Sequence, residues 1–258
     1  MNFGFLLYDS RSGSTLFSSL LHKYDGVTVS LETGFASRVY DYSKPTSTKE
    51  EIERFVNHLF VEKHISETGL TKKDVLSCLP IPLTKAAAVE NIAKLLFRND
   101  TENFSIIKHP PYYYLRELIR DFPEIKFIFL VRDGRDVHLS KAETTSTSGK
   151  KMSTNIIKSA LKWKKSSKLI QGYGSRMLVI RYEDLLSQPE NTLRKTLEFL
   201  GINEMREVRR ADDYASRIGD AQKGLHKNLS KPILKSNKAK WLDKMSDEEV
   251  YLYQKIAG

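Results

Sequence analysis

Short apolar runs alternate with stretches of helical periodicity along most of the chain. Five runs have the length and the apolar content of buried strands, and helical patterns lie between most of them. Such alternation is typical of a parallel α/β sheet with crossover helices. We therefore predict an α/β fold with a central, mainly parallel sheet whose five strands are Phe3–Tyr8, Val27–Leu31, Phe104–Lys108, Lys126–Arg132 and Arg176–Arg181.

The segment between residues 46 and 99 shows no convincing strand pattern. Two of its stretches, EEIERFVNHLFVEKH and LTKAAAVENIAKLLF, carry apolar residues at helical spacing. We predict a helical insertion over about residues 46–99 and a variable tail over about 214–258. Both are expected to belong to one domain that spans residues 1–258.

The stretch DSRSGSTL, residues 9–16, links the first predicted strand to an amphipathic helix. The first N–H groups of a helix have no intrahelical partner and lie at the positive end of its dipole, so this arrangement is typical of a phosphate site. In the triphosphate pattern G-x-x-x-x-G-K-[ST], Ser14 would replace the lysine that reaches the β and γ phosphates. Arg11 supplies charge from a different position. Taken alone, the stretch also fits a simple anion nest or a tight turn.

Charged side chains stand at the ends of the predicted strands, where ligands bind in parallel sheets. A carboxylate, Glu32, follows the second strand, and cationic groups stand at the ends of the other four. Cations gathered near a helix N-terminus suit a ligand with several phosphates, and a carboxylate among them is available as a base. The cationic groups are Arg11 after the first strand, Lys108 and His109 at the end of the third, Arg132 in RDGRDVHLS, and Arg181 in RYEDL.

Composition narrows the class of protein further. The 258-residue chain has a formal net charge of +10, which admits nucleic acid, acidic membranes or small polyanions as partners. No run approaches the ~20 apolar residues of a membrane span, no basic and apolar leader precedes the first strand, and neither zinc-ligand spacing nor an aromatic-and-basic RNA signature is present. The single Cys78 excludes an internal disulfide and fits helical packing. We expect a cytoplasmic protein without a nucleic-acid partner or a membrane span.

These motifs resemble those of the sulfotransferases that use 3′-phosphoadenosine 5′-phosphosulfate (PAPS) as donor. SRSGST is similar to the family's 5′-phosphosulfate loop, P-[RK]-[SA]-G-[ST]-[ST], with Ser10 where proline is common. Arg132 and Ser140 have the spacing of the family's 3′-phosphate motif. RYEDL, at residues 181–185, also looks like the family's sequence, including Tyr182.

The resemblance runs from Phe3 to about Leu200, with a weaker echo around Lys240 and Trp241. It implies a P-loop-like three-layer sandwich, PAPS as co-substrate and no metal. The residues that it implies for donor binding are Arg11, Ser12, Gly13, Ser14, Thr15, Leu16, Arg132, Ser140, Tyr182 and Lys240.

Within the family the chain is most similar to the branch of tyrosylprotein and carbohydrate sulfotransferases. In members like the tyrosylprotein enzymes, a catalytic glutamate lies in an E-T pair, and Glu32-Thr33 is at the matching distance from Arg11. Lys108 matches the lysine of a K-x-P motif that touches the leaving group. The resemblance thus implies Glu32 as the base, with Lys108 and Arg11 as catalytic cations.

Besides Ser10, two positions depart from the patterns of known members. His109 is an alternative base, because cytosolic small-molecule sulfotransferases use a histidine two residues after this lysine, whereas His109 follows Lys108 directly. Ser146 stands where the tyrosylprotein enzymes have a second 3′-phosphate arginine. We expect Arg135 or a tail lysine to replace that arginine.

The function expected from this resemblance is transfer of the sulfuryl group of PAPS to a hydroxyl or amine by in-line displacement, which leaves adenosine 3′,5′-bisphosphate (PAP). The acceptor is expected to be a carbohydrate, a glycolipid or a natural product. A P-loop-like nucleotide kinase is one alternative, although it would need Mg²⁺ and the missing lysine. A non-catalytic protein that binds polyanions or nucleic acid is another, although it would not need Glu32 and Lys108 at strand ends.

Structural interpretations of the same residues stay open beside the functional ones. Glu32 also fits a strand-end carboxylate paired with Arg38, and RDGRD fits an ordinary turn in which Asp133 or Asp136 caps a helix. Trp163 and Trp241 are expected to pack in the core. The sequence does not indicate an oligomeric state.

Overall fold

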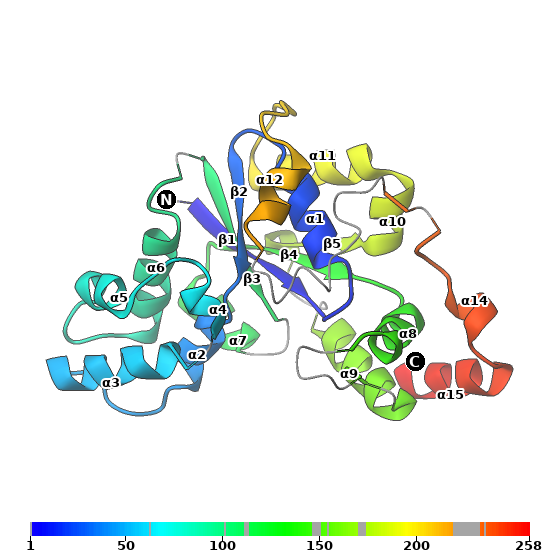
Figure 1. Ribbon diagram of the computed structural model, residues 1–258, viewed down its shortest axis with the longest axis horizontal. Helices are drawn as coiled ribbons and strands as arrows, with labels where there is room; N and C mark the ends of the chain where they lie inside the picture. The colour runs from blue at the N-terminus through cyan, green and yellow to red at the C-terminus, as the bar shows by residue number, and fades with distance from the viewer. Residues whose placement is uncertain are drawn as a thin grey trace. The chain divides into compact units, whose positions relative to one another are not determined.

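The structure is a computed structural model with a five-stranded sheet at its centre, in the order β2-β3-β1-β4-β5 (Figure 1). The strands are β1 (Asn2–Tyr8), β2 (Val27–Glu32), β3 (Phe104–His109), β4 (Lys126–Val131) and β5 (Met177–Arg181). The residues that the structure describes are 2–61, 63–100, 102–110, 114–145, 151–153, 155–169, 174–218, 233–234 and 236–258.

All five predicted strands are confirmed, and each observed boundary lies within one residue of the predicted one. β2 pairs with β3, and β4 with β5, in parallel. β3 is buried along its whole length, including the polar side chains of Ser105, Lys108 and His109. The predicted α/β sheet is therefore correct.

The chain forms two compact units. The first contains Met1–Leu6 and Gly26–Lys126, and the second contains Leu7–Asp25 and Phe127–Gly258. Both units contribute strands to the sheet.

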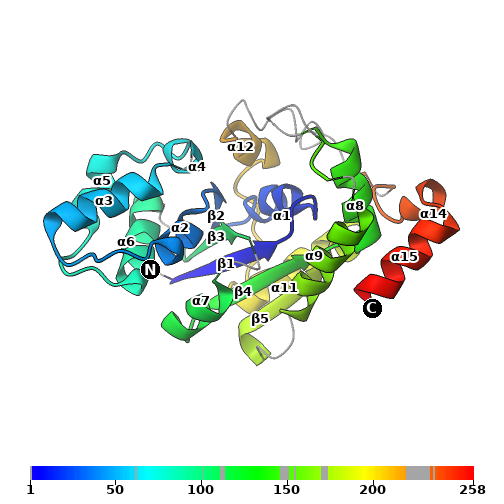
Figure 2. The same cartoon turned by 90° about the horizontal axis from the view of Figure 1, so that it is seen from below.

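The first unit holds the segment that was predicted to be helical. Helices α2, α3, α5 and α6 lie side by side in Figures 1 and 2, and Thr48, Thr71 and Thr84 cap the last three of them through their side chains. Cys78 is half-buried at the end of α5 and its thiol donates to the carbonyl of Val75, consistent with a packing role. The helices of this unit are α2 (Phe35–Asp41), α3 (Lys49–Leu59), α4 (Lys63–Ser66), α5 (Lys72–Cys78), α6 (Lys85–Leu96) and α7 (Leu115–Asp121).

The second unit carries the helix that follows the β1 loop and all helices after β4. Its helices are α1 (Ser14–Leu21), α8 (Gly134–Glu143), α9 (Ile156–Lys168), α10 (Tyr182–Ser187), α11 (Pro189–Leu200), α12 (Ala211–Ser216), α14 (Trp241–Lys244) and α15 (Asp247–Ala257), with a 3₁₀ turn, η1 (Gly174–Arg176), before β5. No helix within the described ranges has the length and apolar character needed to cross a membrane.

The tail helices pack on the helices that follow β4. α15 lies along α9, and α14 lies against α8 (Figure 2). Ala160, Met245 and Tyr253 form a small buried cluster between them, and Trp163 and Trp241 pack against it. The packing role predicted for both tryptophans is confirmed, and this cluster attaches the tail to the part of the unit that carries the RDGRD motif.

Candidate functional site

The loop between β1 and α1 is held in place by Asp9. The Ser12 N–H and hydroxyl donate to the Asp9 carbonyl at 3.1 and 2.6 Å, and the Ser10 N–H donates to the Asp9 carboxylate at 2.8 Å. The same carboxylate accepts from the ammonium of Lys141 in α8 at 3.1 Å, in a buried ion pair. Burial lowers the pKa of Lys141, while the charge of Asp9 opposes that shift. The loop is thereby fixed to α8.

The same loop has a left-handed backbone at two positions. Arg11 has φ 71°, which is uncommon for a residue with a side chain, and Gly13 has φ 90°. A Cβ on Gly13 would lie 2.3 Å from the ring of Tyr182, so a glycine is required there. Gly13 is also the N-cap of α1 and caps it with no side chain. The first N–H groups of α1 are therefore left for another acceptor.

Arg132 follows β4 and has an unusual environment for a cation. The residue is 6% exposed, and its guanidinium donates from Nη1 to the Arg11 carbonyl at 3.1 Å and from Nη2 to the Asn237 carbonyl at 3.0 Å. Its Cζ lies 4.6 Å from the centre of the Tyr182 ring, and Asp136 Oδ2 is 3.8 Å from Nη2. Nε is buried and has no hydrogen-bond partner among the described residues. A buried guanidinium that leaves one donor unused has capacity for an anion.

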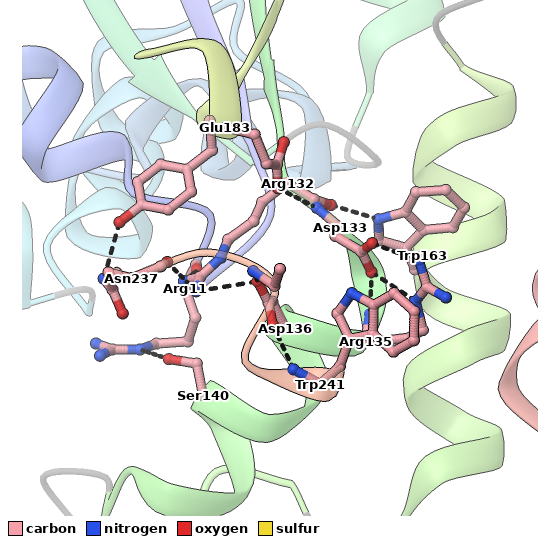
Figure 3. A network of polar contacts seen from close by, with 12 residues as sticks. Arg11, Arg132, Asp133, Arg135, Asp136, Ser140, Trp163, Glu183, Asn237 and Trp241 are labelled. Atoms are coloured by element: carbon pink, nitrogen blue, oxygen red, sulfur yellow. Dashed lines mark hydrogen bonds and ion pairs between the residues drawn. The ribbon is translucent and has the colours of Figure 1, made fainter. Parts of the chain in front are cut away.

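Arg11 and Ser140 lie next to Arg132 (Figure 3). The Arg11 Nε donates to the Ser140 hydroxyl at 3.1 Å, although the two residues are far apart in the sequence. The pKa of Arg11 is lowered by burial and, to a smaller extent, by the positive charge of Arg132. Two guanidiniums that disfavour each other's charge would both be stabilised by a shared anion.

Tyr182 begins α10 directly after β5 and is buried. Its hydroxyl accepts from the Asn237 side-chain amide at 2.8 Å, and burial raises its pKa against the opposing charge of Arg132. The next residue, Glu183, accepts from the Asp133 N–H at 2.9 Å and so ties RYEDL to RDGRD. Lys240, the remaining predicted ligand, is half-buried at the N-cap of α14.

Arg135 was expected, as an alternative to a tail lysine, to replace the second 3′-phosphate arginine. Arg135 donates to both carboxylate oxygens of Asp133, at 3.0 and 2.7 Å, and its Cζ lies 3.4 Å from the centre of the Trp241 ring. These contacts engage Arg135 with Asp133 and Trp241. Ser146 lies outside the described residues.

The first unit holds the other predicted catalytic residues. Glu32 at the end of β2 is the direct cross-strand partner of Lys108 in β3, so the carboxylate and the ammonium belong to neighbouring positions. An irregularity in the pairing lies between Val29 and Glu32, and such bulges re-aim the side chains that follow them. Glu32 is half-buried and Lys108 is 4% exposed. His109 is 0% exposed and packs edge-on against Phe5.

The predicted residues therefore form one group in each unit. In the second unit the structure brings together Arg11, Arg132, Ser140 and Tyr182, next to the loop that contains Ser12 and Gly13. In the first unit it brings Glu32 beside Lys108. Sequence reasoning gave no role to Asp9 or Asn237, and it considered Asp136 only as a helix cap. Of the first two, only Asp9 carried a signal, since it directly follows the first strand.

A sheet with cationic strand ends and a loop that leads into a helix N-terminus defines an α/β protein with an anion site. A family model described as "Sulfotransferase family" matches residues 9–207. The chain belongs to this sulfotransferase family, as its motifs predicted.

A sequence relative agrees with this membership, and a solved structure shows the same fold. The chain is 28% identical over 203 residues to protein-tyrosine sulfotransferase 2 of Gallus gallus, over 75% of this chain and 49% of that protein, so it spans about half of that relative's length. It is also similar to the solved sulfotransferase domain of the Synechococcus PCC 7002 olefin synthase, with a TM-score of 0.62 at 19% identity over 100% of this chain and 95% of that one.

Two further structures show the same fold. The sulfotransferase domain from the curacin biosynthetic pathway has a TM-score of 0.61 at 19% identity, over 99% of this chain and 97% of that one. Mouse sulfotransferase SULT7A1, solved in complex with PAP, has a TM-score of 0.54 at 13% identity, over 99% and 82%. The predicted P-loop-like α/β fold is confirmed.

The fit between Gly13 and the Tyr182 ring generates a first prediction. Gly13→Ala should lower the free energy of unfolding by about 2–4 kcal/mol, since it combines an unfavourable φ with a steric clash, and it should weaken PAP binding. Gly69→Ala is the matched control, because Gly69 has φ 79° with nothing within 4 Å of an added Cβ. It should cost only about 1 kcal/mol and leave PAP binding intact. Denaturant unfolding and calorimetry measure both effects, and equal losses in the two variants would contradict the close packing of Gly13 and Tyr182.

Proposed function

We propose that this protein transfers the sulfuryl group of PAPS to a hydroxyl or amine acceptor, without a metal, and releases PAP. The observation that carries the proposal is that Arg11, Arg132 and Ser140 lie together, and that the buried Arg132 guanidinium has an unused donor at Nε. This group is adjacent to a loop whose glycine leaves the N-terminus of α1 uncapped by a side chain. Membership of the sulfotransferase family supports the same conclusion.

The residues of the second unit fit the two anionic ends of PAPS. Arg132, Ser140, Tyr182 and Lys240 would hold the ribose 3′-phosphate, and Arg11 with the N–H groups of Ser12, Gly13, Ser14, Thr15 and Leu16 would hold the 5′-phosphosulfate. The buried Nε of Arg132 and the opposed charges of Arg11 and Arg132 are both satisfied by an anion in this place. When bound, PAPS supplies an activated sulfuryl group for in-line displacement.

The residues of the first unit would perform the chemical roles. Lys108, assisted by Arg11, would stabilise the negative charge that develops on the leaving bridging oxygen. Glu32 would accept the proton of the acceptor. The bulge before Glu32 and its partial exposure favour it over His109, whose ring is fully buried against Phe5.

The acceptor is proposed to be a carbohydrate, a glycolipid or a natural product in the cytoplasm. Two of the similar domains come from the curacin biosynthetic pathway and from an olefin synthase, which supports a natural-product hydroxyl. The relative named for protein tyrosine makes a phenol worth including in the test. Incubating the protein with labelled PAPS and an acceptor panel, with and without a chelator, and measuring PAP tests the reaction. PAP formation that requires Mg²⁺, or none with any acceptor, would count against the proposal.

A second prediction concerns the base. Glu32→Gln should lower turnover by roughly 10²- to 10⁴-fold, the usual range for a general base, because the amide cannot take the acceptor's proton. PAP affinity, measured by calorimetry, should stay close to that of the wild type. Turnover that survives in Glu32→Gln but is lost in His109→Ala would instead identify His109 as the base.

A third prediction concerns the cation at the leaving group. Lys108→Met keeps most of the buried side-chain volume but removes charge where it is needed in the transition state, so kcat should fall by at least about 100-fold while donor affinity changes little. Lys49→Met removes one charge at an exposed position and serves as the control. A rise in the KM for PAPS with unchanged kcat would show that Lys108 only binds. Added Mg²⁺ should restore nothing.

A fourth prediction addresses the 3′-phosphate, which AMP lacks and PAP carries. One charge-assisted and one neutral hydrogen bond together favour the 3′-phosphate by roughly 2–4 kcal/mol, so wild-type protein should bind PAP ~30- to 1000-fold more tightly than AMP. Arg132→Ala should abolish most of this preference and leave AMP affinity nearly unchanged. Calorimetry with both nucleotides measures it, and equal binding by the wild type would reject the proposed function itself.

A further inference from the structure

The tail contacts two of the proposed 3′-phosphate ligands through one residue. Asn237 accepts from Arg132 with its main-chain carbonyl, at 3.0 Å, and donates to the Tyr182 hydroxyl with its side-chain amide, at 2.8 Å. Figure 3 shows Asn237 beside Arg132 and Arg11. The position of the tail main chain at Asn237 therefore affects the surroundings of the 3′-phosphate group directly.

A buried carboxylate holds the next part of the tail. Asp136, in the first turn of α8, is 1% exposed, and its two oxygens accept from different tail N–H groups. Oδ2 accepts from Ala239 at 2.7 Å and Oδ1 from Trp241 at 3.1 Å, as Figure 3 shows for Trp241. Lys240 lies between these two anchored residues. The main chain on both sides of Lys240 is thus fixed to the helix that follows RDGRD.

Two features argue that Asp136 does more than begin its helix. The N-cap role belongs to Asp133, whose carboxylate accepts from the Arg135 N–H at 2.9 Å. Ala239 has φ 56°, a left-handed conformation that costs free energy in a residue other than glycine. Its hydrogen bond to Asp136 compensates for that cost and keeps the tail in this conformation.

We infer that Asp136 is a positioning residue of the donor site. Its carboxylate fixes the segment 237–241 so that Asn237 and Lys240 complete the pocket for the 3′-phosphate. Asp136 also lies 3.8 Å from the Arg132 guanidinium, so one buried carboxylate aligns the arginine and the tail that contacts it. The inference rests on the proposed function, since it concerns the same nucleotide.

Asp136→Asn tests this inference with little change in volume. The amide retains one acceptor and turns a donor toward the second N–H, so the tail should lose one charge-assisted bond and gain a repulsive contact. We expect PAP affinity to fall by about 10- to 100-fold, and AMP affinity to change by less than about 3-fold. Hydrogen exchange at the amides of Ala239 and Trp241 should accelerate, while exchange in β4 should not.

Glu143→Gln is the matched control. Glu143 lies on the same helix and pairs with Lys244 of the tail, but this ion pair is exposed. Exposed pairs contribute little, so the PAP-to-AMP preference should change by less than about 3-fold. An equal loss in both variants would show that removing any carboxylate from α8 is sufficient, which would overturn the inference.

Further outcomes separate the inference from the proposed function. If wild-type protein does not prefer PAP to AMP, the proposed function fails. If it does, and Asp136→Asn keeps that preference or weakens both nucleotides equally, only the role of Asp136 fails.

A second approach does not depend on how well Asp136→Asn folds. In the wild-type complex with PAP, the amides of Ala239 and Trp241 should be protected from exchange, and unprotected amides there would overturn the inference. Asn237→Ala adds an independent arm, because its effect on PAP affinity should be less than additive with that of Asp136→Asn if both act through the tail.

Discussion

A guanidinium buried at the end of a strand must be surrounded by acceptors, and the second unit is organised around this requirement at Arg132. The Tyr182 ring and the tail both contact the guanidinium and shield it from water. It donates to two main-chain carbonyls, and a carboxylate lies 3.8 Å away. The two carbonyls are neutral, and the Asp136 carboxylate lies beyond hydrogen-bond distance of Arg132 and accepts from two N–H groups of the tail, so together they compensate the buried charge only in part. An incoming phosphate would supply the remaining negative charge and an acceptor for the buried Nε of Arg132.

The remaining constraints of this unit follow from keeping that arginine in place. The Trp163 indole N–H donates to the Arg132 carbonyl at 2.9 Å, which fixes the main chain at the end of β4. The Arg11 carbonyl reaches Arg132 only because the loop turns through a left-handed residue, and Asp9 and Lys141 hold that loop against α8. Gly13 then allows the Tyr182 ring to lie against the loop. Loop, ring and arginine are thus mutually dependent, and a change in one displaces the others.

The sequence predicted the parts of the fold and site that depend on local pattern. The side chains of β1, β2, β3 and β4 are mostly buried, and β5 is an apolar run in which only Ile180 is buried. These short runs located the strands, and the motif spacing located Arg11, Arg132 and Ser140. Contacts between distant segments carry no such pattern. RDGRD was compatible with a cap at Asp133 or at Asp136, and the structure assigns the cap to Asp133. Nothing in the sequence near Asp136 indicates that its partners are main-chain N–H groups in the tail, because any residue except proline supplies that donor.

Each unit carries a different part of the proposed reaction. The proposed donor binding would use fixed charges and main-chain groups in the second unit, which many mutual contacts hold in place. The first unit places Glu32 and Lys108 on paired strands, β2 before and β3 after a segment of capped, amphipathic helices. An insertion stabilised by its own caps and its own apolar faces can change its outer surface without disturbing those strand ends. A single donor site could therefore serve different acceptors, which explains why the motifs indicate the donor clearly and the acceptor only by class.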